Sequence, residues 1–418
     1  MKLKLVTALT ITAVMLAACG GDDSTTTTTT ASAPPAVTPP AVTPPAVTPP
    51  ATPQKVTQLF AQTNDAQNAV LHFVRNADGT LTAMPSLATG GKGTNGVNYF
   101  MGNTVAPDAL TSNNSLIVSP DGTRLFVANA GDNTVSVFSI SGSTLSLLAV
   151  SPTGGTRPTS LAFSNGVLYV THQQGAQELG AYRVGDDGKL SAIGQYAVVV
   201  QDALPTQVSL SPDGKFVIVN GFLRTVTPTA PLNTLLAFPV QADGTLGTPV
   251  NSTSAGVGPF GGRFGTGALA STYVVTDAPG GSVESFSFSE PSGNFTSTGA
   301  PVTVTGQAAP CWISLTPDNR FAYIGNGSGA VSLFSIDGAG KLTLVNASAA
   351  TETPVAGQSS AFANDSWVSP DGKFLYQDYA GDDKIVAYAI GADGALSKLG
   401  EQPANTQSKI SLQGLTGI

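Results

Sequence analysis

The chain has 418 residues, of which only 11% are charged, and it contains 47 Gly and 29 Pro. Soluble domains carry roughly 25% charged residues, and this chain, with a net charge of −8, lacks the basic patch that a nucleic-acid-binding protein needs. Val, Ile and Thr are abundant, and turn-forming residues divide the chain into short segments. We therefore expect an all-β protein and no nucleic-acid partner.

The N-terminal stretch, residues 1–18, is predicted to be a signal peptide. It has a short basic start and an apolar run that is too short for a comfortable transmembrane helix. The run ends in Leu16-Ala17-Ala18-Cys19, which resembles the lipobox of bacterial lipoproteins; an ordinary secretory signal with an incidental Cys is the alternative. The resemblance implies a lipid on Cys19 that anchors the protein to a membrane. Gly20 stands where inner-membrane lipoproteins often carry Asp, so we expect the cell envelope, either the outer membrane or the extracytoplasmic face of the membrane.

A segment of low complexity follows, and we assign residues 19–53 to the lipidated Cys and a disordered stalk. It contains a run of six Thr (25–30) and three copies of Ala-Val-Thr-Pro-Pro (36–50). Such a sequence cannot bury a core and favours polyproline II, which extends by ~3.1 Å per residue. The stalk would hold the following domain away from the membrane.

From residue 54 the chain repeats a strand motif in which an apolar residue is followed three positions later by an aromatic one. The aromatic residues are 44 to 65 residues apart, and the first interval is the longest. The seven copies are Val70-Phe73, Val135-Phe138, Leu179-Tyr182, Leu235-Phe238, Val283-Phe286, Val331-Phe334 and Ile385-Tyr388. A repeat of this length with no helical period indicates a repeat fold made of strands.

Turn motifs flank each copy and complete the repeating unit. Five copies are followed by Asp-Gly, which supplies the positive φ angles of a tight hairpin: Asp78-Gly79, Asp187-Gly188, Asp243-Gly244, Asp337-Gly338 and Asp393-Gly394. Upstream lies a second turn with Pro at its first corner: Ser119-Pro120-Asp121-Gly122, Ser211-Pro212-Asp213-Gly214, Ser369-Pro370-Asp371-Gly372 and the variant Thr316-Pro317-Asp318-Asn319. Each unit therefore contains four antiparallel strands.

Seven such units predict a seven-bladed β-propeller over residues 54–418. A β-sandwich is the competing interpretation, but it does not explain a repeat of this length. The first unit begins at what should be its second strand, Gln58 to Gln62, and residues 410–418 remain after the last complete unit. We expect this C-terminal segment to supply the missing inner strand and close the ring, which removes an exposed strand edge.

The residues Ser119 to Ile140, SPDGTRLFVANAGDNTVSVFSI, resemble a blade of the seven-bladed lactonase propellers, which include 6-phosphogluconolactonase and carboxymuconate cyclase. The resemblance covers residues 54–418. The same string is also similar to YVTN-type repeats of microbial surface proteins, which are not enzymes. Neither Trp312 nor Trp367 is followed by Asp, which separates the chain from WD-repeat proteins.

The lactonase resemblance also implies where catalytic residues would stand. A family string with two His matches Leu204-Pro205-Thr206-Gln207-Val208, so both imidazoles are replaced here. The family Arg that follows Gly-Pro matches Arg263 if two residues are inserted after Gly258-Pro259. The family Asn-Glu pair matches Asp277 and Ala278, so an acid is present only if Asp277 takes over the role.

Two functions follow, and they belong to different classes. The first is a binding or scaffold propeller displayed on the envelope, with a small-molecule or protein ligand at the channel face bound by Thr206, Gln207 and Arg157. The second is a divergent lactonase that acts on an exported lactone, with Arg263 and Asp277 as its catalytic residues. The missing His and Glu favour the first. We expect a monomer without a cofactor. We also expect no bound metal, since no His, Cys or carboxylate cluster has metal-ligand spacing.

The remaining reactive side chains have structural interpretations. His72 lies inside a predicted strand, where alternation decides its burial. His172 ends the second strand of blade three, a position held by Asn or Asp in most other blades, so backbone bonding at the strand end is favoured over a ligand role. Cys311 has no partner in the domain once Cys19 is lipidated, so no disulfide is expected.

The lipobox prediction can be tested with the Cys19→Ser variant of the whole chain. Without the thiol no acyl chain can be attached, so we expect loss of labelling by fatty-acid analogues and release of the protein from the membrane fraction. Unchanged labelling in this variant would refute the lipobox.

Overall fold

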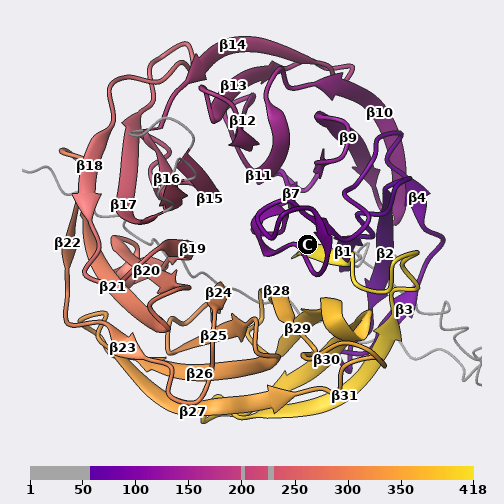
Figure 1. Cartoon of the computed structure of the whole chain (residues 1–418), viewed down its shortest axis with the longest axis vertical. Helices are drawn as coiled ribbons and strands as arrows, with labels where there is room; N and C mark the ends of the chain where they lie inside the picture. Colours follow the sequence, from indigo (N-terminus) through magenta and orange to yellow (C-terminus); the bar gives the residue numbers. More distant parts are fainter. Residues whose placement is uncertain (1–56, 199–202, 225–229) are drawn as a thin grey trace, which may run out of the picture. The chain divides into compact units, whose positions relative to one another are not determined.

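The alternating strands of the repeats form seven antiparallel sheets around a central axis in the computed structural model (Figure 1). The structure describes residues 57–198, 203–224 and 230–418; the predicted signal peptide, the lipid site Cys19 and the stalk lie outside these residues. The prediction of an all-β, seven-bladed propeller is confirmed. Every blade has four strand positions, and the outermost position of blades one and five is divided between two short strands.

The two inner strands of each blade run antiparallel to one another. The innermost strands, in blade order, are β32 (Gln413–Gly417), β7 (Leu116–Val118), β11 (Thr156–Ser164), β15 (Ala203–Leu210), β19 (Pro259–Phe264), β24 (Pro310–Leu315) and β28 (Ala363–Val368). The second strands are β1 (Gln58–Gln62), β8 (Arg124–Asn129), β12 (Val167–Gln174), β16 (Phe216–Arg224), β20 (Thr272–Asp277), β25 (Phe321–Asn326) and β29 (Phe374–Tyr379).

The third strands contain the seven aromatic motifs, as predicted, and the fourth strands form the rim. The third strands are β2 (Ala69–Arg75), β9 (Thr134–Ser141), β13 (Leu179–Val184), β17 (Ala230–Pro239), β21 (Ser282–Ser289), β26 (Ala330–Ile336) and β30 (Lys384–Ile390). The rim strands are β3 (Leu81–Ala83) with β4 (Leu87–Ala88), β10 (Thr144–Pro152), β14 (Leu190–Tyr196), β18 (Val250–Thr253), β22 (Asn294–Ser297) with β23 (Val302–Thr303), β27 (Leu342–Thr351) and β31 (Leu396–Pro403).

The C-terminal strand closes the ring, as predicted. β32 pairs antiparallel with β1, and Leu59 lies opposite Gly417. Leu412 and Leu415 are buried between blades seven and one, in a cluster that also contains Tyr376. The inner edge of β1 is therefore paired rather than open.

The turns between first and second strands have the expected chemistry. In the first of them Gly122 N donates to Ser119 O at 2.8 Å, and Gly122 takes a φ of 71°. The Ser119 hydroxyl donates to Asp121 Oδ1 and accepts from Arg124 N at 3.0 Å, which ties the turn to the next strand. The same pattern of side-chain bonds recurs at Ser211, Ser369 and Thr316.

The turn expected at Asp337-Gly338 is displaced. Gly340, not Gly338, has the positive φ, of 80°, and Gly340 N donates to Asp337 O at 2.9 Å. Asp337 therefore occupies the first position of this turn, which Asn76 occupies in the hairpin that contains Gly79. The prediction for this blade was wrong because two Gly lie near each other, and only the strand register selects the one that turns.

The core consists of apolar clusters between adjacent blades. Within the described residues there is one cluster for each of the seven interfaces, and an eighth lies at one end of the channel. Buried Tyr hydroxyls link neighbouring blades: Tyr169 donates to Gly244 O at 3.0 Å, and Tyr376 donates to Gly79 O at 2.8 Å. Each blade is thus stabilised by both of its neighbours.

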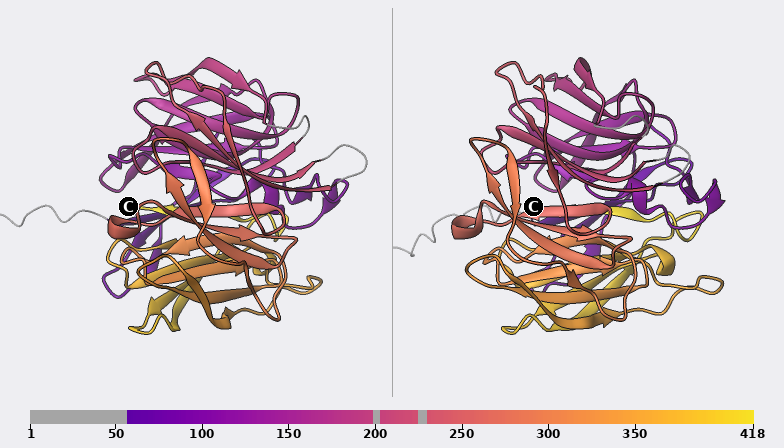
Figure 2. Two further views of the ribbon diagram at one scale, coloured as in Figure 1. Left: turned by 90° about the vertical axis from the view of Figure 1, so that its left-hand side faces the viewer. Right: turned by 60° about the vertical axis from the view of Figure 1, so that its left-hand side comes forward.

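An insertion between blades one and two covers one face of the ring. It contains the hairpin β5 (Val97–Asn98) and β6 (Thr104–Val105) and the short helix η1 (Ala109–Thr111). Figure 2 shows this hairpin at one face of the propeller and the C-terminus at the opposite face. The other short helices are η2 (Gly267–Leu269) and η3 (Ala380–Asp382).

Ring closure predicts the effect of deleting residues 407–418, which removes β32 and leaves β31 intact. The deletion exposes the partners of Ile410, Leu412 and Leu415, and each buried side chain of this kind contributes roughly 1.5–3 kcal/mol. We expect the Tm to fall by roughly 10 °C or more, with self-association through the exposed edge of β1. Calorimetry and light scattering measure both effects, and Ile418→Ala, which keeps the strand, is the control. A truncated chain with the parent's Tm would contradict the role of β32.

Candidate functional site

A short polar segment, Ser112–Ser115, contacts residues of all seven blades; we call it the axial plug. The hydrogen bonds, in blade order, are Gln62 Nε2 to Ser115 Oγ (2.8 Å), Ala128 N to Ser115 O (2.8 Å), Leu161 N to Asn114 O (3.0 Å), Asn114 Nδ2 to Val208 O (3.2 Å), Arg263 Nη1 to Asn114 Oδ1 (2.8 Å) and Trp312 Nε1 to Ser112 Oγ (2.5 Å). In blade seven the Ser112 hydroxyl lies near Asp365 and favours the charged form of its carboxyl group. A polar segment can be buried here because every blade supplies a partner. The plug closes the channel at this level.

The fit of the plug explains the glycine in the C-terminal Gln-Gly-Leu sequence. A Cβ atom on Gly414 would lie 2.4 Å from Ser115 Oγ, and Gly414 has a φ of +70°. Only Gly combines this backbone conformation with so close an approach. The closing strand and the plug are therefore fitted to each other.

Leu110, just before the plug, packs into the apolar cluster at this end of the channel. Its neighbours Phe222 and Phe260 meet edge to face with ring centroids 5.1 Å apart, and Phe260 meets Trp312 at 6.0 Å. Leu204 and Ala278 belong to the same cluster. Ala278 stands where the lactonase resemblance places the acid, and Leu204 begins the string that matches the family histidines.

Thr206 and Gln207, two of the predicted binding residues, connect blade four to blade five. Thr206 Oγ1 donates to Phe260 O at 2.8 Å. Gln207 Nε2 donates to Gly262 O at 2.7 Å, and Gln207 Oε1 accepts from Gly262 N at 2.9 Å. Both side chains are buried, and their hydrogen-bonding groups are used by the neighbouring backbone.

Arg157, the third predicted binding residue, holds the insertion against blade three. Its guanidinium lies 5.4 Å from the centre of the Tyr99 ring, and Nη2 donates to Val97 O at 3.3 Å. Its backbone N donates to Asn133 Oδ1 at 2.8 Å. The cationic group is thus occupied by the protein's own insertion.

Asp277 ends β20 and is buried beside a second carboxyl group, that of Glu284. Ser254 Oγ donates to Glu284 Oε1 at 2.7 Å and to Asp277 Oδ1 at 3.2 Å, and Ser282 Oγ donates to Asp277 Oδ2 at 3.1 Å. Gly256 N donates to Glu284 Oε1. Burial, with the adjacent Glu284 charge, raises the pKa of Asp277 well above its ordinary value. Asp277 is therefore protonated near neutral pH and is held by blade five.

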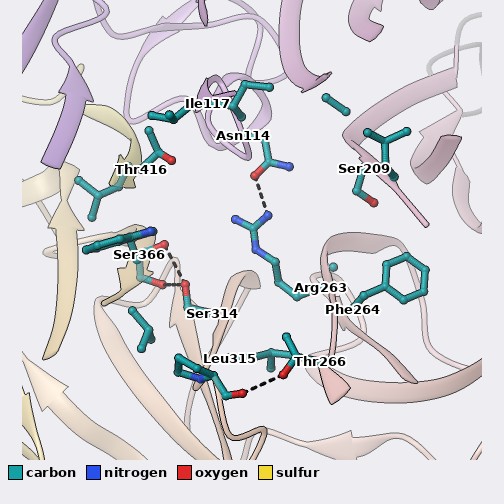
Figure 3. Close-up of a pocket in the computed structure, with 18 of the residues that line it drawn as sticks. Asn114, Ile117, Ser209, Arg263, Phe264, Thr266, Ser314, Leu315, Ser366 and Thr416 are labelled. Atoms are coloured by element: carbon teal, nitrogen blue, oxygen red, sulfur yellow. Dashed lines mark hydrogen bonds between the residues drawn. The ribbon is translucent and has the colours of Figure 1, made fainter. Parts of the chain in front are cut away.

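Arg263, on β19, reaches into the channel on the other side of the plug (Figure 3). A cavity of about 550 Å³ opens here, and Arg263 is the one charged side chain among the described residues that line it. Arg263 pairs with Val274 of β20, whereas Asp277 lies three residues further along, about 10 Å at ~3.3 Å per residue. The structure does not bring the two predicted catalytic residues together.

Two acidic side chains lie behind the plug and determine the local charge. Asp365 accepts from Gly414 N at 2.9 Å, and burial raises its pKa to about 6 although Arg263 favours its charged form. Asp378 is fully buried, and within the described residues neither of its carboxyl oxygens has a hydrogen-bond partner. Burial and the nearby Asp365 raise the pKa of Asp378 well above its ordinary value. Of these two acids, Asp365 is the one whose charge acts on Arg263.

Both described histidines are buried and outside the cavity. His72 Nε2 lies 2.8 Å from Gln58 Oε1, and its ring stacks on Phe60. His172 is fully buried, and neither ring nitrogen has a hydrogen-bond partner in the described part of the chain. Burial lowers the pKa of His172 to about 4, so the ring is neutral at pH 7.

Other chemistry is limited in the described part of the chain. In residues 57–198, 203–224 and 230–418 no group of three or more His, Cys, Asp or Glu is placed to hold a metal ion. None of the helices in these ranges combines the length and apolar character needed to cross a bilayer. Cys311 is buried and unpaired, and burial raises the pKa of its thiol.

Sequence reasoning missed the plug and the two acids behind it. The plug lies in an insertion that has no repeat motif, and its one signal is the 65-residue interval between the first two aromatic residues. Asp365 and Asp378 lie in strands that fit the repeat, so nothing in their spacing distinguishes them. Only the packing of seven inner strands around one axis places these side chains near Arg263.

The comparisons identify the family. A model of the family "Lactonase, 7-bladed beta-propeller" matches residues 62–203 and 269–409, more than half of the chain. This chain therefore belongs to the seven-bladed lactonase propeller family. A search of curated proteins finds no match.

Solved structures with low sequence identity share the fold. A candidate 6-phosphogluconolactonase from Bacteroides fragilis is 18% identical with a TM-score of 0.64, and the alignment covers 88% of this chain and 100% of that one. A periplasmic gluconolactonase from Pseudomonas aeruginosa is 18% identical with a TM-score of 0.64, covering 87% and 99%. Hydrazine synthase from Kuenenia stuttgartiensis is 14% identical with a TM-score of 0.53, covering 72% and 89%.

Burial of His172 predicts a pH dependence of stability. The unfolded chain binds a proton at this residue below its ordinary pKa near 6.5, and the folded chain does so only near pH 4. Stability should therefore fall by about 3 kcal/mol as the pH drops from 6.5 to 4. We expect His172→Asn, which copies the residue of several other blades, to lack this loss. Urea unfolding across this pH range measures it.

Comparing the parent with the His172→Asn variant isolates the contribution of His172 to the pH dependence of stability. The raised pKa values of the buried acids favour the folded state as the pH falls, and this effect is common to both chains. Identical pH slopes for the variant and the parent would therefore contradict the assignment.

Proposed function

We propose that this chain is an envelope-anchored binding or scaffold module built on the lactonase propeller, and that it has lost the lactone hydrolysis of its family. The observation that carries the proposal is the apolar, plugged end of the channel. Opening a lactone requires a general acid or base near the carbonyl and a group that stabilises the oxyanion. Thr206 and Ala278 stand where the family resemblance places an imidazole and a carboxyl, and neither can transfer a proton.

The charges at this end argue against a phosphorylated sugar as substrate. A phosphate group is best bound by several cationic donors. Arg157 is stacked on Tyr99 and bonded to Val97 O, and Arg263 is on the other side of the plug. The apolar cluster at this end, which contains Phe222 and Phe260, offers no hydrogen-bond donor from these rings to a phosphate.

A divergent lactonase that acts on a different, exported lactone is the second candidate, and its support is family membership together with Arg263. In such an enzyme Arg263 would stabilise the developing oxyanion. The described residues that line its cavity include no His, Asp or Glu that could activate water. This absence is why we rank it second.

The anchor is part of the proposal and rests on the sequence. A lipid on Cys19 and the Pro/Thr-rich stalk would display the propeller outside the cytoplasm, where one structural neighbour is described as periplasmic. We propose a monomer, since β32 of the same chain pairs with the edge of blade one that would otherwise be open.

The proposal predicts no hydrolysis of 6-phosphogluconolactone above the spontaneous rate. Loss of one positioned acid or base typically costs about 10²–10⁴-fold in rate, and here both are replaced. A pH-stat assay at pH 7 measures ring opening, with gluconolactone and uncharged lactones included to test the second candidate. Arg263→Ala and Asp277→Asn serve as comparisons and should behave as the parent does. Turnover at an ordinary enzyme rate that Arg263→Ala abolishes would restore the lactonase.

A further inference from the structure

We propose that the open mouth of the channel, on the face opposite the insertion, binds a small organic carboxylate with an apolar body, and that Arg263 is its anion-binding group. This inference rests on the proposed binding function and specifies its site and ligand class. It concerns the cavity of Figure 3, which the plug separates from the end where the family resemblance places an imidazole and a carboxyl group.

The cavity has the size and construction of a small-molecule site. Its volume of about 550 Å³ lies within the roughly 300–1,000 Å³ usual for such sites. Asn114 of the plug and Arg263 lie at its inner end, so the plug forms a floor (Figure 3). The walls come from the ends of the inner strands, and their larger apolar residues are Ile117, Phe163, Leu210, Phe264, Leu315 and Trp367.

Arg263 differs from the other arginines whose side chains the structure describes. Each of those has an ion pair or a backbone carbonyl as partner: Arg75 with Asp371, Arg124 with Gly185 O, Arg157 with Val97 O, Arg183 with Asp243 O, and Arg320 with Asp318. Arg263 is half-buried, and its one hydrogen bond among the described residues uses Nη1, toward the neutral amide of Asn114. A guanidinium has five N–H donors. Most of its donors are therefore available on the cavity side.

Asp365, the acidic residue whose charge acts on Arg263, forms no ion pair with it. Asp365 attracts the guanidinium through space, but its carboxylate accepts from Gly414 N, and the ion pairs of the described residues do not include Arg263. A carboxylate is the anion whose two oxygens match the planar fork of a guanidinium. One cation favours one negative charge, so a dianion such as a phosphate ester would be less well matched.

The polar groups on the walls favour an apolar body over a sugar. Ser366 Oγ donates to Ser314 Oγ at 2.9 Å, and Ser314 Oγ donates to Ser366 O at 2.8 Å, so these hydroxyls are used by each other and by the backbone. Ser209 Oγ is also on the wall and has no hydrogen-bond partner among the described residues, so it can bond one ligand group. A polyhydroxylated ligand would still bury several hydroxyls without partners, which costs free energy. Aromatic or aliphatic carbon would instead contact Phe264, Leu315 and Trp367.

Isothermal titration calorimetry with 2-naphthoate and its neutral analogue 2-naphthamide tests the inference at pH 7.5. The full chain is used in its Cys19→Ser form, so that no detergent competes for the probes. We expect naphthoate to bind at least ~10-fold more tightly than naphthamide, because hydrogen bonds to charged groups are worth more than neutral ones. Arg263→Gln should remove that preference and leave naphthamide binding unchanged, and Arg263→Lys should retain part of it.

The controls separate charge from position and from folding. Arg183→Gln removes one positive charge from β13, outside the cavity lining, and should leave naphthoate affinity unchanged. If Arg263→Gln does not fold, as judged by circular dichroism, the naphthoate-to-naphthamide ratio of the parent and of Arg263→Lys decides the question. Equal affinity for the two probes, no saturable binding of naphthoate, or full naphthoate affinity in a folded Arg263→Gln protein would overturn the inference.

Failure of this ligand-binding inference can be distinguished from failure of the proposed non-catalytic function. Ring opening of lactones by the parent would refute the non-catalytic proposal, and it is read in a different assay with different ligands. Naphthoate selectivity that depends on Arg263 would still locate an anion site at the open mouth. Loss of that selectivity without any hydrolysis would refute only the inference on ligand class.

Discussion

The contacts between Ser112–Ser115 and the seven blades determine what the channel of this propeller can do. The inner strands of a ring direct polar groups toward its axis, where water or protein must satisfy them. In this chain an insertion supplies the partners, one blade at a time. One end of the axis is therefore protein interior, lined by Leu110 and the rings around Trp312, and the other end remains a cavity. The two ends therefore differ in the side chains that they offer to a ligand.

Family membership gives this protein a scaffold, and the chemistry depends on which side chains that scaffold positions. A fold can keep its blades, turns and closure after the groups that transfer protons have been replaced. Ala278 packs in the apolar cluster at one end of the channel and Thr206 bonds the backbone of blade five, so both residues contribute to stability. Arg263 is different because the plug leaves most of its donors without a protein partner.

Acidic side chains with strongly shifted pKa values are usually taken as a sign of an active site. In this structure such side chains also occur away from the cavity. Asp277, Asp365 and Asp378 all have raised pKa values, and in each case burial is the first cause. Asp277 accepts hydrogen bonds from Ser254 and Ser282, and Asp378 is buried and is not among the residues that line the cavity. Only Asp365 affects the open mouth, through its charge. Position relative to the cavity, rather than the size of a shift, selects the functional group.

The repeat architecture could be derived from the sequence because its signals are local. Seven aromatic strand motifs, the Ser-Pro-Asp-Gly turns and the leftover C-terminal residues define the blades and their closure within short windows of chain. The Asp337 turn shows the limit of that approach, since two Gly were available and the strand register chose Gly340. Arg263 could be singled out from the family resemblance, whereas its separation from Asp277 depends on strand register and could not.

The sequence by itself determined the fold class, the number of blades, the closing strand and the residue types available for chemistry. Tertiary structure alone decided that Ser112–Ser115 fills the axis, that Thr206, Gln207 and Arg157 are occupied by the protein itself, and that Arg263 faces a cavity. The physical reason is that these two levels of structure depend on interactions over different separations along the chain. Strand and turn preferences act between residues a few positions apart, but the axis is formed by seven strands from the whole length of the chain. Which polar groups remain free there depends on all of them together.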